Sequence, residues 1–311
     1  MPASPAKTPP PQTLAQEIEW PTLLVALSIY GSYALLTLNY HRLPLLGVFP
    51  LAGFVIAWHG SLQHEVVHGH PTPWRRFNKL LVFPSLWLWL PFGCYRRTHL
   101  VHHRDEFLTD PSQDPESYYL YPQNWQALPK ILRAALVVLN TSIGRLVFGP
   151  VFSLIGFAGE QLRRLRQGHF ETRAWLQHGA GCVLVLYWVM GICQIPLWEY
   201  LLVFAYPGLA LTLLRSYAEH QARPAVSERT TAVEAGWLMS LLYLNNNLHP
   251  MHHERPGLAW YRLPQAWREN RTRLLNANGG NCYPGYARLI AAYAFRRREN
   301  PSWPLAVKST A

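Results

Sequence analysis

Four apolar stretches of near membrane-spanning length constrain the fold of this chain more than any other feature. They cover residues 20–38, 43–58, 180–195 and 197–214. A helix that crosses the hydrocarbon core needs about 20 residues, so the third stretch is short for a crossing. Only "NYHR" and "QIP" join the two stretches of each pair, so each pair is expected to cross and return as a hairpin. We therefore predict an all-α integral membrane protein with four transmembrane helices in two hairpins.

The distribution of basic residues orients these hairpins. The formal net charge is +11, and Arg42 is the only basic residue in the two outer turns apart from histidine. The other ends of the spans carry Arg75, Arg76, Lys79, Arg96, Arg97, Arg104, Arg163, Arg164, Arg166, Arg173, Arg215 and Arg223. Because cytoplasmic loops are enriched in Lys and Arg, this pattern predicts a multi-pass protein whose segments after spans two and four are cytoplasmic. No nucleic-acid module is evident, so the charge does not indicate a nucleic-acid partner.

Two further apolar segments are not assigned as spans. Residues 80–95 contain two prolines and are too short for a crossing, so we interpret them as re-entrant or interfacial. Residues 131–160 include Arg133, Asn140, Arg145 and Pro150, which favours interfacial helices, with another hairpin as the alternative. The remaining divisions are a disordered Pro-rich tail (1–18), one membrane domain (19–299) and a C-terminal tail (300–311).

Nine of the fourteen histidines follow a pattern. His64 and His68 form HxxxH, and "HLVHH" from His99 and "HPMHH" from His249 form two HxxHH boxes. His220 stands just after the fourth span. On a helix, residues i and i+4 share a face, so HxxHH projects its first and last imidazoles together and turns the middle one, such as His102, aside.

This number of imidazoles indicates two metal ions, because a zinc site takes three or four ligands. Imidazole suits Zn, Cu, Fe and Ni, so ligand type leaves the element open. The four cysteines show no CxxC spacing, which argues against Cys-ligated zinc or an iron–sulfur centre. All three boxes fall on the predicted cytoplasmic side.

The boxes "HEVVH", "HLVHH" and "HPMHH", in this order, resemble those of the membrane fatty acid desaturase family. The continuations "HHRDEFLTDPSQDPES" and "HHERPGLAWYRLP" are similar as well, and the resemblance covers about residues 20–264. It implies a non-haem diiron centre in a cytosolic cap, which activates O2 and abstracts hydrogen from an unactivated C–H bond. The iron ligands that it implies are His64, His68, His99, His102, His103, His220, His249, His252 and His253.

Several neighbours of these histidines could hydrogen-bond their second ring nitrogen. The candidates are His70, Glu65, Asp105, Asp114, Glu219 and Glu254. In stearoyl-type members of the family, an Asn one turn before the position of His220 contributes through water. Ser216 stands there in this chain, so Asn245, Asn246 or Asn247 is the alternative source of a polar contact.

The resemblance also implies partners. Diiron oxygen chemistry needs two electrons per turnover, and the chain has no GxGxxG, flavin signature, haem motif or Cys cluster. We therefore expect an external electron donor, a separate redox protein of the ferredoxin, rubredoxin or cytochrome b5-like kind. The expected substrate is a lipid or fatty acyl group that would be desaturated. Its groove could be lined by Trp87, Trp89, Tyr95, Tyr187, Trp188 and Tyr243.

Other functions remain as alternatives. The same metals could serve a hydroxylase, a carotenoid ketolase-like oxygenase or an alkene-forming fatty acid decarboxylase. A literal HExxH begins at His64 and is typical of zinc proteases, in which Glu65 would be the general base. Neither the xxGxxH continuation nor a distant Asp-Gly ligand follows it, and a protease has no use for two more boxes. A metal transporter would need ionisable residues in the spans, which are nearly free of them.

Overall fold

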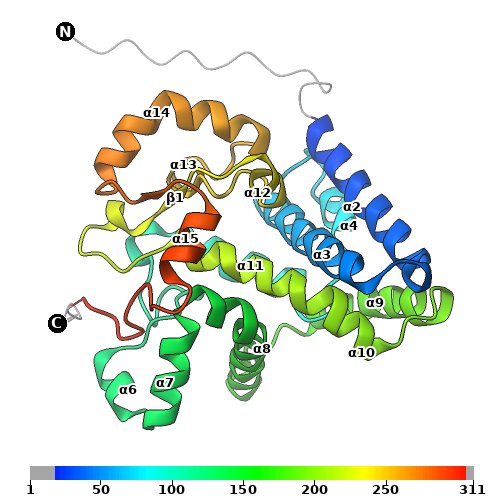
Figure 1. Ribbon diagram of the computed structural model, residues 1–311, viewed down its shortest axis with the longest axis horizontal. Coiled ribbons are helices and arrows are strands. Elements are labelled where there is room, and N and C mark those ends of the chain that lie inside the picture. The colour runs from blue at the N-terminus through cyan, green and yellow to red at the C-terminus, as the bar shows by residue number, and fades with distance from the viewer. Residues whose placement is uncertain (1–17, 306–311) are drawn as a thin grey trace.

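The computed structural model describes residues 18–305, and Figure 1 shows that this part of the chain is built almost entirely of helices. The predicted tail at 1–18 lies outside these residues except for Ile18, as do residues 306–311 of the predicted C-terminal tail. Residues 301–303 are packed against the body. The Pro301 carbonyl accepts a bond from the Leu120 backbone, and Trp303 is buried.

The first pair of apolar stretches forms α2 (Trp20–Leu38) and α3 (Leu45–Val67), joined by a single 3-10 turn, Tyr40–Arg42. α3 continues beyond the predicted end at residue 58 and carries His64 in its last turn. It does so because the rest of the protein encloses this part of the helix, where His59 and Gln63 are buried.

The second pair forms α9 (Thr172–Leu186) and a long helix made of α10 (Leu197–Tyr200) and α11 (Tyr206–Glu219). Single π-helical segments, Tyr187–Ile192 and Leu201–Ala205, continue α9 and join α10 to α11. α9 begins before residue 180, the predicted start, because its first turns are packed against α5 (Phe92–His102). Gly93 and Ala174 are so close that a Cβ on Gly93 would stand 2.8 Å from the Ala174 methyl.

α3 and α11 cross closely, which brings the ends that carry His64 and His220 together. The contact depends on small residues, as is common between membrane helices. A Cβ on Gly208 would lie 2.4 Å from Cγ2 of Ile56, and one on Gly53 would lie 2.9 Å from Pro207.

Residues 131–160 fold into α7 (Lys130–Leu139) and α8 (Ser142–Arg166). Among the described residues, five helices are long and apolar enough to cross a membrane, one more than predicted, and α8 is the additional one. Arg145 argued against a long apolar helix here, but its guanidinium is buried over the rings of Tyr118 and Tyr217, at 5.0 and 5.6 Å. The sequence alone does not show that two tyrosine rings cover this guanidinium.

Both ends of α8 are fixed to segments close to the histidine boxes. At its start, the Asn140 carbonyl accepts a bond from the Tyr217 hydroxyl (3.1 Å), three residues before His220. At its end, Arg164 pairs with Glu171 (3.3 Å), which also contacts Arg97, two residues before His99. The two ends of the helix therefore lie on the same side of the molecule as the boxes.

Residues 80–95 form no spanning helix. They comprise the end of α4 (Arg75–Leu81), an irregular loop and the start of α5. The loop is enclosed by protein: the Tyr200 hydroxyl donates to the Leu86 carbonyl, and Leu86 and Trp87 are buried. Irregular backbone at membrane depth is tolerated under such cover.

The remaining elements gather at the end of α11 away from α10 (Figure 1). They are α6 (Pro122–Ala127), α12 (Trp237–Leu242), α13 (His249–Glu254), α14 (Leu263–Ala277) and α15 (Tyr286–Tyr293). Two short parallel strands, β1 (Ala232–Val233) and β2 (Cys282–Tyr283), pair Ala232 with Cys282. Trp260 connects this region to the first helix, because its indole N–H donates to Thr22 (3.1 Å).

Candidate metal centre

Four separate segments bring the predicted histidines together. His64 lies in the last turn of α3 and His68 directly follows that helix. α5 carries His99 and His102 in its last turn and is followed by His103. α13 supplies His249, His252 and His253, and His220 directly follows α11.

The nine histidines form two groups, and within each group the nearest ring nitrogens lie within 4.8 Å of one another. The first group contains His64, His68, His99, His103 and His252, and the second contains His102, His220, His249 and His253. The first and last histidines of each HxxHH box stay together, whereas the middle one enters the other group. The boxes of α5 and α13 are therefore shared between both groups.

The Nε2 atoms in each group point at one another. In the first group, Nε2 of His99 lies 3.2 Å from that of His68 and 3.1 Å from that of His103. In the second, Nε2 of His220 lies 3.0 Å from that of His102 and 2.8 Å from that of His249. Ring nitrogens that converge in this way can bind a common cation.

The surroundings keep most of these rings neutral, as metal binding requires. Burial, reinforced by the neighbouring imidazoles, lowers the pKa of His103, His220, His249 and His252 well below the ordinary value. It lowers the pKa of His68 to about 2. His102 differs: burial lowers its pKa, but Glu116 and Asp114 outweigh that effect and raise it to about 9. A metal ion at the second group would therefore displace a proton.

Carboxylates contact the second ring nitrogen, Nδ1, of several histidines. Nδ1 of His99 contacts Glu116 (2.9 Å), Nδ1 of His102 contacts Asp114 (2.9 Å), and Nδ1 of His253 contacts Asp105 (2.8 Å). Such partners fix the tautomer and orientation of a ligating histidine. Glu219 and Glu65 lie farther from Nδ1 of His249 and His64, at 3.4 and 3.6 Å.

Two other predicted neighbours of the histidines have different partners. Glu254 pairs with Arg273 (2.7 Å), and its carboxylate has no ion pair with a histidine among the described residues. His70 lies outside both groups and bonds to Glu19. Glu116 was missed, although it stands in the acidic continuation of the second box; its distance along the chain from His99 hid the contact.

The position of Glu65 argues against the protease interpretation of HExxH. Its carboxylate lies 3.6 Å from Nδ1 of His64 and accepts a bond from the Trp260 backbone (3.2 Å). A general base would have to face the metal-bound water. Glu65 instead connects α3 to the segment that follows α13.

Ser216 stands where some members of the family have an Asn, and in this protein Asn246 makes the polar contact to a histidine. The Asn246 side-chain amide lies 3.4 Å from Nε2 of His64 and donates to Glu219 at 3.2 Å. Ser216 donates to the Leu213 carbonyl and lines a small cavity beside Glu116, Glu219 and His220. Asn245 and Asn247 bond to backbone carbonyls elsewhere.

The charge of the site suits two divalent cations. Glu65, Asp105, Asp114, Glu116 and Glu219 each approach a histidine, and Arg215 lies 3.0 Å from Glu219. The carboxylates therefore outnumber the arginine, and acidic surroundings favour cations. Nine imidazoles in groups of five and four fit iron, for which imidazole is a suitable ligand.

Long apolar helices that end in two clusters of buried histidines define the class of a membrane metalloprotein. A sequence model of the fatty acid desaturase family matches residues 40–280, and the chain belongs to that family. The resemblance noted in the three boxes is thereby confirmed. No curated protein matches the chain.

Proposed function

We propose that the protein is a membrane-bound diiron oxidoreductase that uses O2 to desaturate an aliphatic chain, most simply a fatty acyl group. The observation that carries this proposal is the convergence of nine histidines into groups of five and four in a member of the desaturase family. The reaction balances when one O2 accepts two hydrogen atoms from adjacent carbons and two external electrons with two protons, which gives a double bond and two waters.

Two bound iron ions would supply the reduction of O2 and the oxidising power that removes hydrogen from an unactivated carbon. The residues of this chain hold and orient them. Asp105, Asp114 and Glu116 keep the proton on Nδ1 of His253, His102 and His99, so that Nε2 presents its lone pair to the metal. Asn246 bridges His64 and Glu219 and couples α3 to α11 at the centre.

The proposal includes a four-span topology with the histidines on the cytoplasmic side. Both ends of α8 contact segments next to the histidine boxes, and α9 then leads away to the outer turn. A helix that starts and ends on one side lies along the membrane surface, although its length would allow a crossing. α2, α3, α9 and the α10–α11 helix are then the four spans.

The electron donor is proposed to dock where the second group is nearest to solvent. Asp105 bonds His253, yet its side chain is 51% exposed. Arg104 and Arg255 flank these two residues in the sequence and are both exposed. Exposed arginines beside a metal-holding pair suit contact with an acidic redox protein.

The proposal is tested by expression in a membrane host, with lipid and hydrocarbon extracts analysed by mass spectrometry beside a His102→Ala variant. A new double bond that is absent from the variant is the expected result. A new hydroxyl or keto group, or a shortened alkene, would assign one of the other oxygenase reactions instead. Purified protein that contains one zinc ion and no iron would overturn the diiron centre itself.

A further inference from the structure

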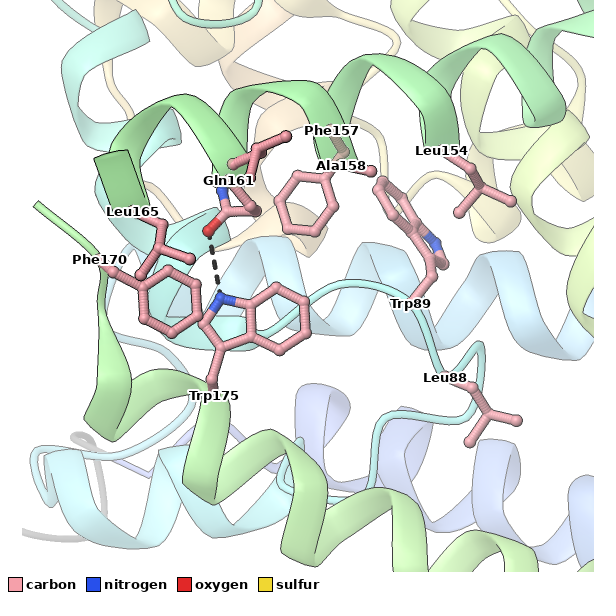
Figure 2. Close-up of a pocket in the computed structure, with 10 residues that line it drawn as sticks. Leu88, Trp89, Leu154, Phe157, Ala158, Gln161, Leu165, Phe170 and Trp175 are labelled. Carbon is pink, nitrogen blue, oxygen red and sulfur yellow. Dashed lines mark hydrogen bonds between the residues drawn. The ribbon is translucent and has the colours of Figure 1, made fainter. Parts of the chain in front are cut away.

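An apolar groove lies between α8, the start of α9 and the loop that leads into α5 (Figure 2). Its volume of about 590 Å³ is that of a pocket for an organic ligand. Aromatic rings line it: Trp175 stacks on Phe157 and Phe170, with centroids 6.0 and 5.9 Å apart, and Trp89 meets Phe157 edge-on at 5.4 Å. The Trp175 indole donates to Gln161 (3.1 Å), which fixes the two helices at the groove.

The groove opens onto apolar side chains that no other part of the described chain covers. Leu154, Leu162 and Leu165 line it and are 39, 47 and 55% exposed. Leu176 on the neighbouring helix is 71% exposed. In a membrane protein, such side chains contact lipid tails, so the groove is continuous with the lipid-facing surface.

Basic side chains stand at the end of the groove where α8 is followed by α9. Arg163 and Arg164 are neutralised by Glu160 and Glu171, at 2.7 and 3.3 Å. Arg166 and Arg173 are exposed and form no ion pair within residues 18–305. An apolar groove with two free cations at one end complements a lipid with an anionic head group.

The inner wall of the groove leads toward the histidines. The rings of Trp89 and Trp87 are 5.7 Å apart, and Trp87 packs on Gly60, one helical turn before His64. The indole N–H of Trp89 is buried and has no hydrogen-bond partner among the described residues. Figure 2 shows it facing the space between Leu88 and Leu154. Through Trp89 and Trp87, the wall of the groove therefore contacts the helix that carries His64.

We propose that this groove admits an acyl chain of an anionic phospholipid from the bilayer and passes it to the histidine groups, with Arg166 and Arg173 on the head-group phosphate. The substrate is then an acyl chain esterified in a membrane lipid, rather than a thioester of a soluble carrier. This inference deepens the proposed function and rests on it.

The test uses the full-length, iron-loaded protein in nanodiscs that contain phosphatidylglycerol with a diazirine in its acyl chain. Ala158→Trp fills the groove, since Ala158 lines it and is exposed. Ile155→Trp is the matched control, because Ile155 is 64% exposed on the same helix but does not line the groove. We expect photolabelling of α8 and α9 peptides in the wild type and the control. Labelling should fall about tenfold in Ala158→Trp, equivalent to roughly 1.4 kcal/mol of lost binding.

Activity and metal content complete the test. Ala158→Trp should raise the KM for the lipid-borne chain while bound iron stays at the wild-type level. Labelling spread evenly over lipid-facing helices, or preferential labelling by a diazirine free fatty acid, would overturn the inference. Specific labelling of the groove together with unchanged turnover in Ala158→Trp would also overturn the inference. Because photolabelling needs no turnover, it still reports on the groove if the protein oxidises no chain, and failure of the proposed chemistry is then seen separately.

Discussion

At the scale of single residues, the carboxylates behind the imidazoles determine how well the rings hold a metal. Glu116 shows this most clearly, because one of its oxygens contacts Nδ1 of His99 in the first group and the other lies 4.0 Å from Nε2 of His102 in the second. It therefore lies between the two groups. Its charge acts on both, whereas Asp105 and Asp114 each contact one histidine.

Glu116→Gln should lower iron affinity by about 10- to 100-fold, the usual cost of removing a partner of a metal-ligating histidine. The amide keeps the shape of the side chain but removes the negative charge that favours the cation. Iron retained during titration with a chelator measures the effect. Glu254→Gln is the control, since Glu254 pairs with Arg273 on the surface. Equal iron retention in the two variants would show that Glu116 does not support the metals.

Residue spacing indicates which histidines share a helix face but not how the nine histidines divide into two groups. The i, i+4 rule placed His99 with His103 and His249 with His253, and turned His102 and His252 aside. That each middle histidine enters the other group depends on how α5 and α13 face each other. Side-chain spacing along one helix does not show how two segments face each other. The contact between Glu116 and His99 was not predicted for the same reason.

At the scale of helices, the crossing of α3 and α11 positions both histidine groups. His64 ends one helix and His220 follows the other, so a shift between them displaces both groups. The close approach at Gly208 and Ile56 leaves no room for a side chain.

Gly208→Ala should therefore destabilise the protein by about 1–3 kcal/mol, the usual cost of overpacking. The added methyl would stand 2.4 Å from Ile56, and the helices must separate to admit it. Thermal unfolding in detergent, together with iron content, measures the result. Gly156→Ala in α8 is the control, because nothing lies within 4 Å of its added methyl. An unchanged midpoint for Gly208→Ala would mean that the two helices are less tightly packed.

The orientation of α8 gives a second prediction at this scale. If α8 lies along the surface, Gln167→Cys, just after its end, should react with a membrane-impermeant maleimide from the cytoplasmic side only. Leu43→Cys, in the turn between α2 and α3, should react only from the opposite side. Sealed vesicles of both orientations make the comparison. Reaction of the two cysteines from the same side would show that α8 crosses the membrane.

At the scale of the whole molecule, apolar length and charge predicted the two hairpins but not the role of every long helix. α8 is long because Arg145 is covered by Tyr118 and Tyr217, which are remote in sequence. α3 exceeds its apolar stretch because protein rather than lipid surrounds its last polar turns, whereas the first turn of α9 leaves Thr172 and Arg173 exposed and contacts α5 through Ala174. The apolar pattern of one segment shows which of its own residues can be buried. The lengths of these helices also depend on contacts with other segments.

The arrangement of charge over the molecule leads to the last prediction, which concerns electron delivery. Arg104 and Arg255 flank the half-exposed Asp105, which bonds the buried His253, so reduction by an acidic ferredoxin-like donor should be fast at low salt and slow as salt screens the charges. Arg104→Glu combined with Arg255→Glu should lower the second-order rate at low ionic strength by about 10-fold or more and flatten its salt dependence. Arg42→Glu is the control, since Arg42 lies in the turn between α2 and α3. Stopped-flow reduction of the iron-loaded protein measures all three rates, and a salt dependence that persists in the double variant would place the donor elsewhere.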